Sequence, residues 1–204
     1  MTGPSAVLVD GALLVLDPTA QPAATRDGIV DSLLMALHLA ERATPATPGE
    51  LVSAVVSTLA QLGWVLGSSS NLTTDVRAGR APLDSAGATL GDTGVTAVDS
   101  LRTAPPDALH AWHSFGSTRP GSREALVAHA AATPSGPTLA LVHLSLAPAV
   151  PVKGFPWTRL TTAATLTVHD VSLSTNPAVY TPAMLSELAA KVAGAAGEVI
   201  PLTH

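Results

Sequence analysis

Two histidines three residues apart, His110 and His113, are the side chains whose types and spacing best fit chemistry in this sequence. They lie in the segment DALHAWHSFG, residues 107–116, and Asp107 comes one helical turn earlier. On a helix, residues three apart lie about 60° from each other, so both imidazoles could bind one metal ion. Asp107 and His113 diverge by about 120°, so a complete site needs a ligand from another segment. The candidates are His129, His143 and His169.

The same segment also has the pattern of a structural helix. Leu109 and Trp112 form an apolar stripe beside the histidines, which is typical of a helix that packs on a core and carries polar residues at its edge. We interpret the segment as a packed helix and keep a metal site at His110 and His113 as the alternative. That alternative would make the protein a small metal-dependent or histidine-using hydrolase.

A second pair of histidines lies in the two strongest predicted strands. His143 is in the middle of TLALVHLSL, residues 138–146, and His169 is in TTAATLTVHDVSLST, residues 161–175. If these strands are antiparallel neighbours, the imidazoles can face each other or a carboxylate and form a pH-sensitive pair. The alternative places both histidines on a solvated sheet face, between threonines and serines.

The proline-rich connection between these strands, residues 147–160, carries aromatic and basic side chains. Tryptophan beside basic residues at a loop tip suits a protein partner, a glycan or a membrane interface. We therefore predict a partner-binding loop, made of Lys153, Phe155, Trp157 and Arg159. In the alternative, the two aromatic side chains fold back and cover the open end of the core.

Complete motifs for catalysis or cofactor binding are absent from the sequence. It has no G-x-S-x-G elbow, no P-loop lysine and no dinucleotide fingerprint. It also has no cysteine, which excludes disulfides and thiolate chemistry. We expect no cofactor, and we favour a protein that is not an enzyme.

Charged residues make up only 12% of the chain, whereas about 25% is usual in globular proteins. Small neutral residues must then form much of the surface, and little repulsion keeps copies of the chain apart. We expect part of this surface to be buried against another copy or another protein. The composition predicts a non-enzymatic assembly or protein-interaction module, self-associating or part of a larger particle or a toxin-like system.

Charge and hydropathy also bear on the other classes of partner. The net charge is −5 and the Lys and Arg residues form no cluster, so nucleic acid is not an expected partner. The apolar stretches at 6–16 and 139–152 are interrupted before they reach the roughly 20 residues of a transmembrane helix, and peripheral membrane contact stays open. No basic segment precedes an apolar run at the N-terminus, so we expect no signal peptide and, by default, a cytoplasmic protein.

The helices that would position these residues are marked by apolar spacing and by their ends. Thr47 and Glu50 form a capping box at the start of one helix. Asp27 is the expected N-cap of the helix before it. The predicted helices cover residues 27–43, 47–62, 94–103, 107–115, 123–133 and 181–193.

The strands are short apolar segments bounded by turns. An N-terminal hairpin over residues 6–17 turns at Asp10–Gly11, and a further strand follows Gly63. In the strand at 161–175, the apolar alternation slips by one at His169–Asp170, which is typical of a β-bulge. Residues 77–93 show neither period, which predicts a loop, with one short strand inside it as the alternative.

Together these elements predict one α+β domain over residues 1–204. Its sheet would be antiparallel and would contain the N-terminal hairpin, the strand after Gly63 and the two C-terminal strands. Amphipathic helices would flank this sheet. No internal repeat is evident at the spacing of solenoids or propellers.

Overall fold

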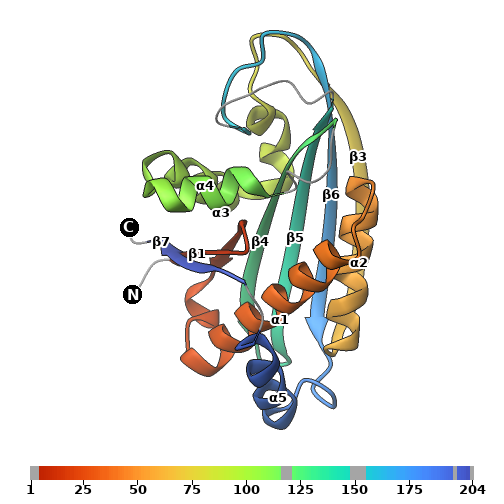
Figure 1. Cartoon of the computed structure of the whole chain (residues 1–204), viewed down its shortest axis with the longest axis vertical. Coiled ribbons are helices and arrows are strands. Elements are labelled where there is room, and N and C mark those ends of the chain that lie inside the picture. Colours follow the sequence, from red (N-terminus) through yellow and green to blue (C-terminus); the bar gives the residue numbers. More distant parts are fainter. Residues whose placement is uncertain (1–4, 116–120, 148–154, 195–196, 203–204) are drawn as a thin grey trace.

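The computed structural model describes residues 5–115, 121–147, 155–194 and 197–202. Its described strands form one seven-stranded sheet in the order β3-β6-β5-β4-β2-β1-β7 (Figure 1). The strands are β1 (Ser5–Val9), β2 (Ala12–Leu16), β3 (Trp64–Val76), β4 (Arg123–Thr133), β5 (Gly136–Ala147), β6 (Ala164–Thr175) and β7 (Val199–Leu202).

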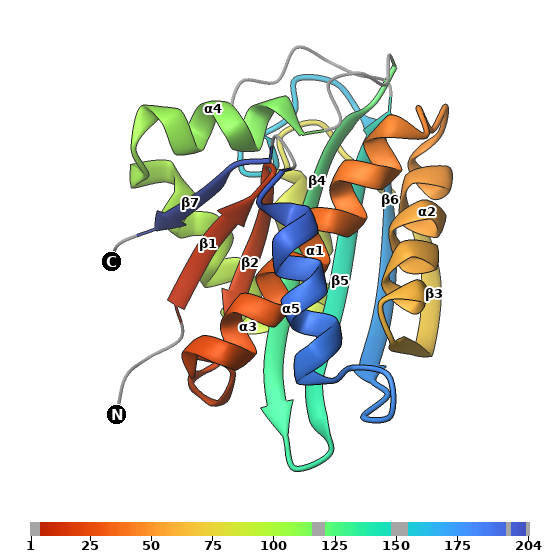
Figure 2. The same ribbon diagram turned by 60° about the horizontal axis from the view of Figure 1, so that its bottom comes forward.

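Helices cover both faces of the sheet, so the predicted α+β class is confirmed (Figures 1 and 2). Helices α1 and α2 pack on one face, and α3 and α4 pack on the other. Helix α5 lies on the outside of α1 (Figure 2). Their bounds are α1 (Ala23–Arg42), α2 (Pro48–Gln61), α3 (Pro82–Ser100), α4 (Pro106–Ser114) and α5 (Pro182–Val192), with short 3-10 turns η1 (Pro18–Ala20) and η2 (Leu101–Thr103).

The sheet is mixed, which corrects the prediction of a purely antiparallel sheet. Strands β2 and β4 pair in parallel, from Leu13 opposite Val127 to Leu16 opposite Ala130. The other described pairs are antiparallel, including the β1–β2 hairpin. The hairpin turns at Asp10 and Gly11 with positive φ angles, as predicted. The parallel pair was missed because its second strand was predicted to be a helix.

That second strand is β4, over REALVAHAAAT, and the predicted helix at 123–133 is wrong. Alanine and leucine favour helices in isolation. In the structure, however, every side chain from Glu124 to Ala128 is buried, because helices cover both faces of the sheet at this point. A strand buried on both faces shows a continuous apolar run instead of alternation. Tertiary burial therefore outweighs the local preference.

Helix α3 corrects the loop predicted at 77–93. Its first part places Leu83 and Ala86 in the core at helical spacing. Gly91, with φ of 64°, interrupts the regular helix and accounts for the irregular pattern in the sequence. Glycine tolerates this left-handed conformation without a steric penalty. The helix predicted at 94–103 forms the second part of α3 and the turn η2.

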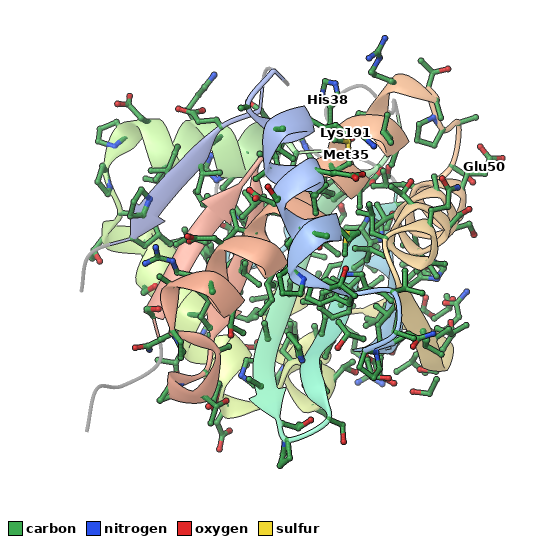
Figure 3. All side chains as sticks on the ribbon, turned by 90° about the horizontal axis from the view of Figure 1, so that it is seen from below. Met35, His38, Glu50 and Lys191 are labelled. Atoms are coloured by element: carbon green, nitrogen blue, oxygen red, sulfur yellow. The ribbon has the colours of Figure 1, made fainter. Side chains whose placement is uncertain are left out.

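Two helix starts test the capping predictions. At α2 the Thr47 Oγ1 accepts a hydrogen bond from the Glu50 backbone N–H at 3.2 Å, and the Glu50 side chain accepts one from the Ala46 N–H at 2.7 Å. Thr47 is therefore the N-cap, as predicted. Helix α1 instead begins at Ala23, one turn before the predicted cap at Asp27. Figure 3 labels Glu50 at the start of α2, Met35 and His38 on α1, and Lys191 on α5.

Strand β6 lacks the bulge predicted at His169–Asp170. Its pairing with β5 runs without a register shift through both residues. Leu166 and Val168 point into the core under α3, whereas Val171 and Leu173 point into the core under α1 and α2. The apolar alternation shifts because the two halves of β6 are covered on opposite faces of the sheet. Helix α3 covers one face, and helices α1 and α2 cover the other.

Candidate interaction surfaces

Strand β3 is a long edge strand, paired on one side with β6 and without a neighbour on the other side among the described strands (Figure 1). The side chains from Val65 to Thr73 are all exposed. Three of them are aliphatic, and about half of the surface of each is exposed: Val65 at 49%, Leu66 at 51% and Leu72 at 53%. Asp75 is the single charged residue in the strand.

Buried side chains fix β3 at both of its ends. Trp64 is 2% exposed, and its ring lies edge-on to that of Tyr180, with 5.4 Å between centroids. Val76 is 1% exposed at the other end. Gly63, with φ of 85°, turns the chain from α2 into the strand. The exposed middle of β3 is thus held between two anchored ends.

The pairing of β3 with β6 is irregular at one place, between Leu66 and Ser68. There Ser172 Oγ accepts a hydrogen bond from the Ser68 backbone N–H at 3.0 Å and also lies 2.8 Å from Ser68 Oγ. From Ser68 to Val76 the register is regular. This regular part forms an extended backbone edge that can pair with another strand.

One row of core side chains crosses the sheet and ends on β3. Ala125, Leu144, Val168 and Leu72 are successive register partners on β4, β5, β6 and β3. The first three are at most 1% exposed, whereas Leu72 is 53% exposed. The apolar layer under α3 therefore reaches the sheet edge. Leu72 is the last residue of this layer and is exposed to solvent.

On the other face of the sheet, the row of register partners contains the two predicted histidines. His143 pairs with His169 across β5 and β6, with ring centroids 5.9 Å apart. Of the two alternatives that the sequence left open, the structure shows the one in which the two imidazoles face each other. His143 is 1% exposed, so the solvated alternative is wrong for it, whereas His169 is half-buried beneath the start of α2.

Burial lowers the pKa of His169, and the neighbouring His143 lowers it further. Both effects disfavour the protonated ring, because burial removes water and a second imidazolium would repel it. A Cβ built on Gly49 of α2 would lie 3.9 Å from His169 Cε1. A charge on His169 would therefore arise at the packed contact between α2 and the sheet.

His143 also meets a buried carboxylate. Its Nε2 lies 3.0 Å from Glu124 Oε2, and both side chains are at most 1% exposed. Ser122 Oγ donates a hydrogen bond to Glu124 Oε1 at 2.9 Å. The cavity beside His143, between α2 and the sheet, has about 10 Å³ of space, enough for roughly one water molecule. This cavity is too small for a substrate beside the His143 ring.

The second surface joins α4 to the loop after residue 154. Trp112, predicted to be a core residue, is 1% exposed, and its Nε1 donates a hydrogen bond to the Phe155 carbonyl at 3.1 Å. Phe155 is 4% exposed and contributes to the core under α3 and α4. Helix α4 and the segment that carries Phe155 are therefore one packed unit.

Trp157 lies at the rim of this unit and is only partly buried. The Arg102 guanidinium lies over its ring at 5.8 Å from the centroid, within the range of a cation–π contact. The His113 ring lies on it with 6.3 Å between centroids. Arg159 is exposed, and Lys153 lies outside the described residues. Partner binding by this loop stays a prediction, and Phe155 would act in it by supporting Trp157 from the core.

His110 and His113 are both exposed on α4. Burial lowers the pKa of His113, with further contributions from the charges of Arg123 and His110. Within 5–115, 121–147, 155–194 and 197–202, no group of three or more His, Asp or Glu side chains is placed to hold a metal ion. The two histidines thus have no third ligand in the described part of the chain, and the metal site stays an untested alternative.

Two features of these surfaces were missed in the sequence. Glu124 was placed on a predicted helix, so its contact with His143 on the neighbouring strand could not be foreseen. The strand after Gly63 was predicted, but its position at the sheet edge was not. The strand has one charge in thirteen residues. This low charge does not by itself indicate an edge position, because buried central strands also carry few charges.

No family model matches the chain, and no curated protein matches it. A solved structure of the Evf virulence factor is similar with a TM-score of 0.42 and 9% sequence identity, over 91% of this chain and 82% of that one. Among the described helices, none is long and apolar enough to cross a membrane.

Proposed function

We propose that this protein is a non-enzymatic assembly module that self-associates through the free edge of its sheet. The observation that carries the proposal is strand β3, a thirteen-residue edge with a single charge and an exposed middle. Edge strands of monomeric proteins are commonly short, charged, interrupted by proline or covered, because their free backbone groups otherwise pair with another chain. Pairing would satisfy these groups and cover the exposed aliphatic side chains.

The low charge of the chain supports the same proposal. Charged residues are 12% of the sequence, so long-range repulsion between copies is weak. An interface built from backbone hydrogen bonds and apolar contacts depends little on screening by salt. Self-association should therefore persist at high ionic strength.

A hydrolase centred on His110 and His113 receives less support from the geometry. Both side chains are exposed, and no third ligand joins them among the residues with a described placement. The surface around Trp157 is a candidate for binding a different protein, because tryptophan and arginine often dominate binding energy. It would act in addition to the β3 edge.

Measuring the mass of the protein in solution tests the proposal. Light scattering over a range of protein concentrations should show a mass that rises above the 20.5 kDa of one chain. The same rise should occur at low and at high salt. A 20.5 kDa particle at the highest soluble concentration would overturn self-association.

Trp157→Ala is the control variant and should leave the dependence of mass on concentration unchanged. A loss of association in this variant would show that the copies meet at the α4 surface and not at β3.

A further inference from the structure

We infer that two copies of the chain join their sheets by antiparallel pairing of β3 with β3, with a twofold axis at Leu72. This inference rests on the proposed self-association and specifies its partner strand and its register. The partner is a second copy of this chain.

The two edges of the sheet differ in how they resist pairing. At one edge, β7 has four residues, and one of them is Pro201. Proline has no backbone N–H to donate, so it blocks the continuation of a sheet. At the other edge, β3 has thirteen residues without proline, lysine or arginine. Only the β3 edge is thus open to extension among the described strands.

The apolar row selects Leu72 as the centre. Leu72 continues the buried row of Leu144 and Val168 but is itself 53% exposed. In antiparallel pairing about Leu72, the Leu72 side chains of the two copies lie directly opposite each other, with Cβ atoms about 4.5–5.5 Å apart. The apolar layer of each copy would then run into that of the other. This register covers both half-exposed leucines with one contact.

The rest of the strand is compatible with this register. The bulge between Leu66 and Ser68 lies outside the regular part, Ser68 to Val76, which would form the ladder. Asn71 would face Thr73 of the second copy, and Ser69 would face Asp75. The two Asp75 side chains would stand six residues apart along the ladder, about 20 Å at 3.4 Å per residue. No like charges meet, although each copy carries a net charge of −5.

Cysteine cross-linking tests the register, because the natural chain has no cysteine. Asn71→Cys mixed with Thr73→Cys should give a disulfide-linked dimer on mild oxidation, since directly opposed residues have the Cα separation that a disulfide needs. Leu72→Cys alone should link to its own copy. Each of Asn71→Cys and Thr73→Cys alone should link more slowly, because 71 and 73 face their own copies only diagonally. Ser186→Cys, exposed on α5, is the matched control and should stay monomeric on denaturing gels.

A charge at the axis tests the contact without cross-linking. Leu72→Lys would place two ammonium groups opposite each other and remove the leucine contact, so the dissociation constant should rise by about tenfold or more. Leu39→Lys is the matched control, because Leu39 is also an exposed leucine, at 41%, but lies on α1. Its dissociation constant should equal that of the natural chain. Circular dichroism should show both variants folded.

The outcomes separate this inference from the proposed function. If the natural chain is monomeric at every concentration, both fail. If it self-associates but Leu72→Lys associates as tightly and the mixed cysteine variants do not link, self-association stands and the β3 register is wrong. If cross-links form instead between Ser186→Cys copies, α5 is the contact. Loss of association in Leu72→Lys, together with linkage of 71 to 73, supports the register.

Discussion

Strand β4, at the centre of the sheet, and strand β3, at its edge, are both long and carry few charges, yet their surroundings are opposite. β4 has neighbours on both sides and buries every side chain from Glu124 to Ala128. β3 has one neighbour and exposes every side chain from Val65 to Thr73. The number of charges in a strand therefore does not show whether it is covered within one chain or left open for another.

The two strands also differ in the partners that their polar groups have. In the centre, Glu124 must find a partner inside the protein, and it meets His143 at 3.0 Å, because an unpaired buried polar group is costly. At the edge, the side chains of Ser68, Ser70 and Asn71 are solvated, and the free backbone groups can exchange water for another strand. Substitutions at the centre should therefore change the stability of the fold, whereas substitutions at the edge should change self-association.

The largest expected effect is in the core under α4, from Trp112→Ala. The side chain is 1% exposed, and removing a large buried aromatic group usually costs about 3–5 kcal/mol of unfolding free energy. Chemical denaturation followed by circular dichroism measures this loss. Trp112→Phe should cost less, because it keeps most of the packing and loses the hydrogen bond to the Phe155 carbonyl. A loss below 1 kcal/mol for Trp112→Ala would show that α4 is not packed as described.

A smaller loss is expected when the buried polar pair is broken. Glu124→Leu leaves the Nε2 of buried His143 without its carboxylate, which should cost about 1–3 kcal/mol. Glu124→Leu combined with His143→Leu removes both polar groups and should recover part of the loss. A double-mutant cycle on unfolding free energies measures the coupling. Losses that simply add would mean that the two side chains do not interact.

The next effect is pH dependence at His169, between the centre and the edge. The folded protein lowers the pKa of this histidine, so below the unfolded value of about 6.5 the unfolded chain binds the proton more readily. Stability should fall as the pH falls from about 6.5 towards the lowered folded pKa. His169→Gln should flatten this fall in denaturation curves recorded from pH 7 to pH 5. An equally steep fall in the variant would assign the dependence elsewhere, with His113 as the first alternative because its pKa is also lowered.

The smallest effect on stability is expected at the edge. Leu72→Thr removes an exposed aliphatic group from β3, so the unfolding free energy of the monomer should change by less than about 0.5 kcal/mol. Measured at a concentration where the chain is monomeric, the denaturation midpoint should match that of the natural chain. At higher concentration the same variant should associate more weakly. A large loss in the monomer would place Leu72 in the core of one chain and remove the contrast between centre and edge.

The sequence by itself determined the features that depend on near neighbours along the chain. Thr47 caps α2 because its hydroxyl reaches a backbone N–H three residues later. Asp10 and Gly11 turn the first hairpin because both adopt positive φ. The facing of His143 and His169 is different: the sequence offered it only as one of two alternatives, and the antiparallel pairing of β5 with β6 decided it.

The tertiary structure decided which side of each strand was covered and by what. The sequence REALVAHAAAT became a strand because it lies between β2 and β5 under two helical layers, although its residues favour a helix in isolation. The shifted alternation of β6 arose from helices on opposite faces at its two ends. The contact of Glu124 with His143 and the exposure of Leu72 depend on strand order. Strand order depends on contacts between residues that are far apart in the chain, so the spacing of neighbouring residues does not predict it.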